Sequence, residues 1–130
     1  MQITQILPYL AGGFLAIYLI FTIISKEKSK IGWIFPAFLS LLFFSYSVFT
    51  VSQEGPIGFW VEHTRNFWGN QIWFDLLLAA SIGWYFILPK ARELKMNLPF
   101  WAFAIVATGS IGFTAMVSRL LYLEEKREKQ

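Results

Sequence analysis

Two charged residues lie within otherwise apolar stretches of the sequence, Asp75 within residues 71–89 and Arg119 within residues 98–122. A charged side chain in the hydrocarbon region of a bilayer costs about 3 kcal/mol on insertion scales, so it usually faces the protein interior and finds a partner. An Asp75–Arg119 pair would fix the register of two helices, or it would form part of a binding or proton-handling site. The alternative is that Arg119 extends alone to the lipid headgroups.

A second group of polar and aromatic residues lies between the two middle apolar stretches. Its members are expected on the same side of the membrane as the charged pair, and they are Glu62, His63, Arg65, Asn70, Trp60, Trp68 and Trp73. Together they would form a polar pocket beneath an aromatic lid. The alternatives are a solvated loop histidine and an ordinary belt of interfacial tryptophans.

Catalytic chemistry has little support in the sequence. There is no cysteine, which excludes disulfides, thiol redox chemistry and thiolate metal sites. The single histidine, His63, cannot provide a bis-histidine haem site. The sequence holds no glycine-rich phosphate loop, nucleophile elbow or zinc-protease motif. We therefore expect a protein without catalytic residues, metal or cofactor.

The elements that would position these residues are four apolar stretches, residues 7–25, 31–52, 71–89 and 98–122. A helix needs about 20 residues to cross a hydrocarbon core of about 30 Å. Backbone hydrogen bonding in lipid requires helices or a closed barrel, and the stretches lack the alternation of barrel strands. Apolar residues make up 56% of the chain and charged residues 15%. The sequence thus predicts an all-α fold, a four-transmembrane-helix antiparallel bundle in a single integral membrane domain, residues 1–130.

The segment 53–70 has the pattern of a short amphipathic helix at the membrane interface. Apolar and weakly polar residues recur at helical spacing, namely Ile57, Trp60, Val61, Thr64, Phe67 and Trp68, and charged residues lie on the other face. The alternative is that residues 64–70 extend the third helix.

Small residues predict how the third and fourth helices pack. Ala79 and Gly83 follow Asp75 at intervals of four, and a second stripe consists of Ala104, Thr108, Gly112 and Ala115 and ends at Arg119. Small side chains let helix backbones approach closely in lipid. Two antiparallel neighbours joined by a short loop would then place Asp75 and Arg119 in the same leaflet.

The distribution of lysine and arginine bears on orientation. The loops 26–30 and 90–95 hold three basic residues each, whereas the middle loop holds only Arg65. The positive-inside rule therefore favours cytoplasmic loops with both termini outside. Lys126, Arg127 and Lys129 in the C-terminal tail favour the opposite orientation.

Residues 67–125 resemble an uncharacterised family of small bacterial four-helix membrane proteins, a domain of unknown function. The resemblance rests on Asn70, Asp75-Leu76, Ala91-Arg92, Trp101 and the segment Leu121-Tyr122-Leu123-Glu124-Glu125. It implies a four-helix fold and no particular activity.

Three functions are compatible with these features. The first is a non-enzymatic membrane protein that acts through helix packing, as an accessory subunit or a homo-oligomer. The second is a small dimeric transporter or channel that uses Asp75 and Arg119. The third is a binder of an apolar ligand such as a lipid, isoprenoid or pigment. In each case the expected location is the bacterial cytoplasmic membrane, with several spans. The bilayer and protein chains are the expected partners, and the small net charge of +3 argues against nucleic acid.

Overall fold

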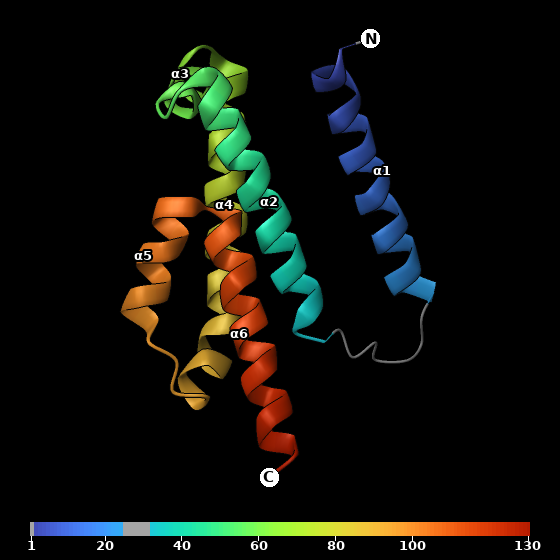
Figure 1. Ribbon diagram of the computed structural model, residues 1–130, viewed down its shortest axis with the longest axis vertical. Coiled ribbons are helices and arrows are strands. Elements are labelled where there is room, and N and C mark those ends of the chain that lie inside the picture. Colours follow the sequence, from blue (N-terminus) through green and yellow to red (C-terminus); the bar gives the residue numbers. More distant parts are fainter. Residues whose placement is uncertain (1, 25–31) are drawn as a thin grey trace. The chain divides into compact units, whose positions relative to one another are not determined.

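The computed structural model describes residues 2–24 and 32–130, and all regular elements among them are helices (Figure 1). The helices are α1 (Ile3–Ile24), α2 (Ile34–Glu54), α3 (Gly58–Thr64), α4 (Phe67–Glu93), α5 (Leu98–Thr108) and α6 (Ser110–Glu128). The chain divides into two units, Met1–Ile31 and Gly32–Gln130. The first contains α1 and the second contains the other helices. The predicted all-helical fold is confirmed.

Three helices, α1, α2 and α4, are long and apolar enough to cross a membrane. They correspond to the first three predicted stretches, although α1 begins earlier than residue 7 and α4 extends the predicted 71–89 at both ends. The predicted end at Ser25, the predicted start at Ile31 and the loop 26–30 lie outside the described residues. The start of α4 is fixed by Asn66, whose side chain accepts the backbone N–H of Gly69 at 2.8 Å.

The expectation of one continuous helix over residues 98–122 is wrong. The helix ends at Thr108, and a second helix begins at Ser110. Between them Gly109 has a φ of +61°, a conformation that glycine adopts without the steric cost of a side chain. With 11 residues, α5 is about 16 Å long, roughly half of what a crossing requires.

The turn at Gly109 reverses the chain, so α5 and α6 form a helical hairpin (Figure 1). The lower half of α6 lies beside the end of α4, where Lys90 pairs with Glu124 at 3.1 Å. It also packs against α2 in the opposite direction, because Ser118 Oγ donates to the carbonyl of Trp33 at 2.8 Å while the earlier residue Ile111 accepts a hydrogen bond from Ser40, further along α2. The C-terminus therefore lies at the same end of this unit as the α4–α5 loop.

The buried core of the second unit sits where α4, α5 and α6 meet. Its four apolar members are Ala91, Met96, Met116 and Leu120, of which Ala91 and Met116 have no exposed surface. Most other large apolar side chains in the described residues are exposed. A soluble protein of this size would bury far more of them, whereas a lipid-facing surface is apolar by nature.

The segment between α2 and α4 contains a separate short helix, α3, so the predicted amphipathic helix is confirmed as a helix. It folds against the start of α4 so closely that a Cβ at Gly69 would collide with the carbonyl oxygen of Glu62. The alternative prediction is also partly correct, because residues 67–70 belong to α4.

Candidate functional site

The structure does not bring Asp75 and Arg119 together. Both side chains are exposed, and no ion pair joins them within the described part of the chain. Because Lys90 is level with Glu124, Arg119 is level with about residue 85 of α4. Asp75 is then about 15 Å away along the helix axis. The prediction of a shared leaflet assumed that residues 98–122 cross the membrane, and the reversal at Gly109 removes that assumption.

Part of the predicted polar pocket does assemble at the α3–α4 junction. The side-chain amide of Asn70 donates to the carbonyl of His63 at 2.6 Å. The His63 and Trp73 rings lie 4.9 Å apart between centroids, and Phe59 packs at 6.4 Å from each. These contacts fasten α3 to α4, so they have a structural explanation.

The remaining members of that predicted pocket face outward. Glu62 and Arg65 form an exposed ion pair at 3.2 Å. The side chains of Trp60 and Trp68 are 52% and 72% exposed, so they do not cover a pocket. An open depression of about 490 Å³ lies nearby, but among the predicted residues only Glu62 lines it. Within residues 2–24 and 32–130 no group of three potential metal ligands exists.

The small residues predicted to pack do so in a different arrangement. A Cβ at Gly83 would lie 2.7 Å from the Phe113 ring, which places Gly83 in the α4–α6 contact. Ala104 and Thr108 belong to α5 and Gly112 to α6, and the turn brings them together. A Cβ at Gly112 would lie 2.6 Å from the carbonyl oxygen of Ala104. The predicted continuous stripe is wrong because the helix is interrupted at Gly109.

Two further predicted packing residues lie elsewhere. Ala115 is half-buried and lines a groove between α6 and α2. Ala79 is exposed on α4. Its position on the surface leaves it available to lipid or to another helix.

The hairpin tip has its own hydrogen-bond arrangement. The N–H of Gly109 bonds to the carbonyl of Ile105 at 2.7 Å, and the N–H of Gly112 bonds to the Thr108 hydroxyl at 2.9 Å. That hydroxyl also donates to the carbonyl of Ala104 at 2.7 Å. One threonine side chain thus ties the end of α5 to the start of α6. Even so, Val106 beside the tip is 87% exposed.

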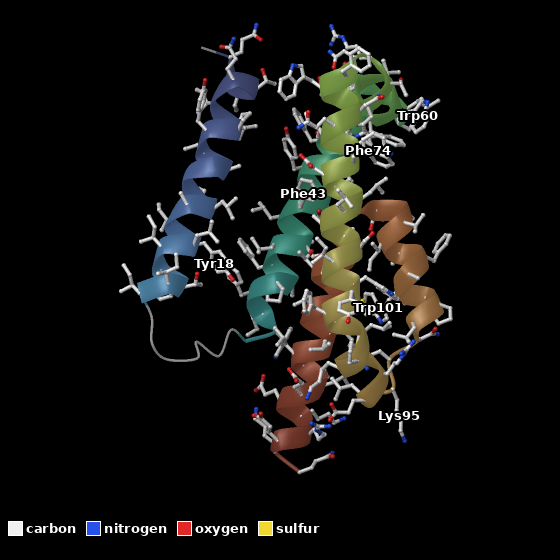
Figure 2. All side chains as sticks on the ribbon, turned by 180° about the vertical axis from the view of Figure 1, so that it is seen from behind. Tyr18, Phe43, Trp60, Phe74, Lys95 and Trp101 are labelled. Carbon is white, nitrogen blue, oxygen red and sulfur yellow. The ribbon has the colours of Figure 1, made fainter. Side chains whose placement is uncertain are left out.

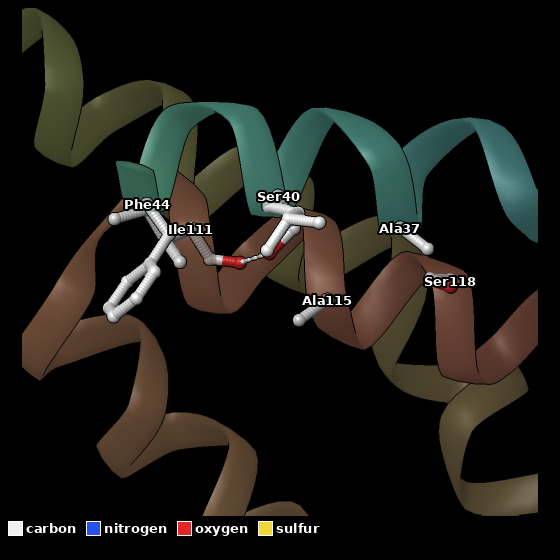
Figure 3. A pocket seen from close by; sticks show the side chains of 7 residues that line it. Ala37, Ser40, Phe44, Ile111, Ala115 and Ser118 are labelled. Carbon is white, nitrogen blue, oxygen red and sulfur yellow. Dashed lines mark hydrogen bonds between the residues drawn. The ribbon is translucent and has the colours of Figure 1, made fainter. Parts of the chain in front are cut away.

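The groove between α2 and α6 has a volume of about 300 Å³ (Figure 3). Its lining residues are Ala37, Ser40, Leu41, Phe44, Ile111, Ala115 and Ser118. Ser40 Oγ donates to the carbonyl of Ile111 at 2.9 Å, and Ser118 Oγ donates to Trp33. Sequence reasoning missed both serines. The available signal was a hydroxyl within an apolar stretch, which in membranes commonly bonds to a neighbouring helix.

An ionic cluster joins α4 to α6 at the end that carries Lys95, opposite the end that carries Trp60 (Figure 2). In it Glu93 pairs with both Lys90 and Arg127, and Lys90 also pairs with Glu124. The hydrogen bond to the Glu93 carboxylate raises the pKa of Arg127. Arg127 therefore stays charged over the physiological range, and the cluster holds the ends of both helices together outside the apolar region.

In comparisons with known proteins, no protein family, curated protein or solved structure matches the chain.

Proposed function

We propose that this chain is a non-enzymatic integral membrane protein that acts by assembling with other chains through helix packing, first of all with copies of itself. The three long helices cross the bilayer, and the α5–α6 hairpin enters and leaves from one side. This arrangement replaces the four-helix antiparallel bundle, because α5 is about 16 Å long and α6 returns beside α4.

The exposed hairpin tip is the observation that supports assembly. With α5 starting at the membrane surface, its end at Thr108 lies near the middle of the hydrocarbon core. A helix that ends there leaves carbonyl groups without intrahelical partners, and the helix that begins at Ser110 leaves N–H groups in the same situation. Interrupted backbone at that depth is tolerated only where protein or a water-filled cavity covers it. Val106 is 87% exposed, so the tip has surface for a covering helix, and we propose that another chain supplies it.

The orientation of the chain in the membrane is inferred from the end of the unit at which the hairpin places the C-terminal tail. Of the eight lysine and arginine residues in the described part of the chain, seven belong to the segments at the end where α4 stops, and one, Arg65, lies at the other end. The positive-inside rule then favours a cytoplasmic C-terminus. The expectation that the C-terminus lies outside is replaced by this proposal, and the expected outside location of the N-terminus stays a prediction.

The location proposed is the bacterial cytoplasmic membrane, and the resemblance of residues 67–125 to the uncharacterised bacterial family stays a prediction. The transporter alternative relied on a pair between Asp75 and Arg119, and those residues do not pair in this chain. An accessory subunit differs from a homo-oligomer only in the identity of the chain that covers the tip.

Cross-linking between chains tests the proposal. The chain has no cysteine, so Val106→Cys introduces a single thiol at the tip. Ile82→Cys on α4 is the control, since Ile82 is 58% exposed within an apolar helix but lies away from the hairpin tip. We expect a bifunctional maleimide to give dimers from Val106→Cys in native membranes and much less from Ile82→Cys. A product with a different protein would identify an accessory subunit. Unlinked chains for both variants, together with a monomeric purified protein, would refute the proposal.

A further inference from the structure

The walls of the groove between α2 and α6 are mainly apolar. Ala37, Ser40 and Phe44 on α2 face Ile111 and Ala115 on α6 (Figure 3). The hydroxyl protons of both lining serines are already donated to backbone carbonyls. From Ile111 to Ser118 the groove extends about 10 Å along α6. An occupant in this stretch would therefore be a hydrocarbon segment.

The end of the groove nearest the start of α2 carries a cation, Arg119, with no acidic partner among the described residues. Arg119 lies one helical turn beyond Ala115, and its guanidinium is 5.4 Å from the centre of the Tyr122 ring. Tyr122 in turn packs edge-on against Trp33 at 5.6 Å. Among the described residues no carboxylate lies within ion-pair distance of Arg119, whereas Arg65 and Arg127 are each paired. Tyrosine and tryptophan side by side are typical of headgroup depth.

We infer that this groove holds one acyl chain of an anionic phospholipid, whose phosphate contacts Arg119. The guanidinium is a strong donor to phosphate oxygens, and the groove leads from it toward the bilayer centre. The glycerol backbone would then lie beside Trp33 and Tyr122, with the chain between α2 and α6.

Charge complementarity favours a lipid over a further helix as the occupant. An apolar helix laid in the groove would cover the end that holds Arg119 and offer it no anion, which is costly at the edge of the hydrocarbon region. A phosphate both neutralises the guanidinium and continues into a chain that matches the groove walls. The inference does not rest on assembly at the hairpin tip, since the groove involves other residues and its test measures lipid.

Native mass spectrometry of the full chain tests the inference. The protein is released from nanodiscs of phosphatidylcholine that contain a minor fraction of phosphatidylglycerol, and the retained lipids are counted. We expect phosphatidylglycerol to be enriched over its share of the bilayer. Arg119→Gln should reduce the enrichment about fivefold, the effect of one basic residue near the surface. Arg92→Gln is the matched control, because Arg92 is exposed at the same end of the unit but belongs to α4, no residue of which lines the groove.

A second pair of variants tests the groove itself. Ala115→Leu places a larger side chain in the groove, and Ala107→Leu adds the same atoms on the exposed surface of α5. We expect the first to abolish the enrichment and the second to keep it, with equal helix content by circular dichroism. Equal losses in Arg119→Gln and Arg92→Gln would overturn the inference. Enrichment retained by Ala115→Leu would also overturn it, as would a change of oligomer size in that variant, which would indicate a helix in the groove.

Discussion

Replacing Gly112 with alanine tests the close approach of α6 to α5. The new Cβ would lie 2.6 Å from the Ala104 carbonyl oxygen and 2.8 Å from Thr108 Oγ1. The backbone oxygen cannot move aside as a flexible side chain can, so the two helices have to separate. Overpacking of this kind costs about 1–3 kcal/mol. Separation also weakens the hydrogen bond from the Gly112 N–H to Thr108, which contributes about 1 kcal/mol.

One contribution has the opposite sign. Alanine is favoured over glycine inside a helix by about 1 kcal/mol, which offsets part of the cost. The net expectation is a loss of about 2 kcal/mol in the free energy of unfolding. The assay is denaturation by sodium dodecyl sulfate in mixed micelles, followed by circular dichroism.

Gly58→Ala provides the control for this measurement. A Cβ there meets only the Glu54 side chain at an ordinary 3.5 Å, so we expect a change within about 0.5 kcal/mol. If Gly112→Ala unfolds at the same detergent fraction as Gly58→Ala, α6 does not approach the Ala104 carbonyl, and the hairpin as described here is refuted.

Three further variants test other contacts by the same unfolding assay. Ser118→Ala removes a hydrogen bond between helices and should cost about 0.6 kcal/mol, the average for such bonds in membranes. Ser45→Ala should cost less, because Ser45 bonds within its own helix; equal costs would contradict the α2–α6 contact. Met116→Ala empties a fully buried position and should cost about 2–5 kcal/mol; a loss under 1 kcal/mol would mean that the core lies elsewhere. Glu93→Gln breaks the exposed pair with Arg127 and should cost up to about 1 kcal/mol, decreasing with added salt; a cost that is independent of salt would contradict this.

Length and hydropathy were sufficient to predict the helices but not the interruption in the last one. Residues 98–122 are apolar apart from a few polar residues and Arg119 near the end, so a hydropathy window finds one span. The signal was local. Glycine commonly follows the last residue of a helix, as Gly109 does here, and serine is common where a helix begins, as at Ser110. Both were interpreted as ordinary members of a span. Whether a glycine inside a membrane helix packs or breaks depends on the neighbours, which here include Ser40 and Thr108.

The incorrect prediction that Asp75 and Arg119 pair has the same cause, the missed interruption at Gly109. Asp75 and Arg119 are correctly recognised as charges within apolar stretches, but their relative depth depends on the direction of α6. Arg119 instead lies next to Tyr122, near the start of α2. By contrast, the contact between His63 and Trp73 involves neighbouring segments, so helical spacing was enough to place these residues on one side.

The reversal at Gly109 is tested most directly by finding on which side of the membrane each end of the hairpin lies. Single cysteines at Lys95, Gln130 and Gln53 are introduced into the cysteine-free chain and treated in intact cells with a membrane-impermeant maleimide. A hairpin predicts that Lys95→Cys and Gln130→Cys are both protected until the membrane is permeabilised, whereas Gln53→Cys reacts at once. Labelling of Gln130→Cys together with Gln53→Cys in intact cells would mean that residues 98–122 cross the membrane, and it would contradict the hairpin.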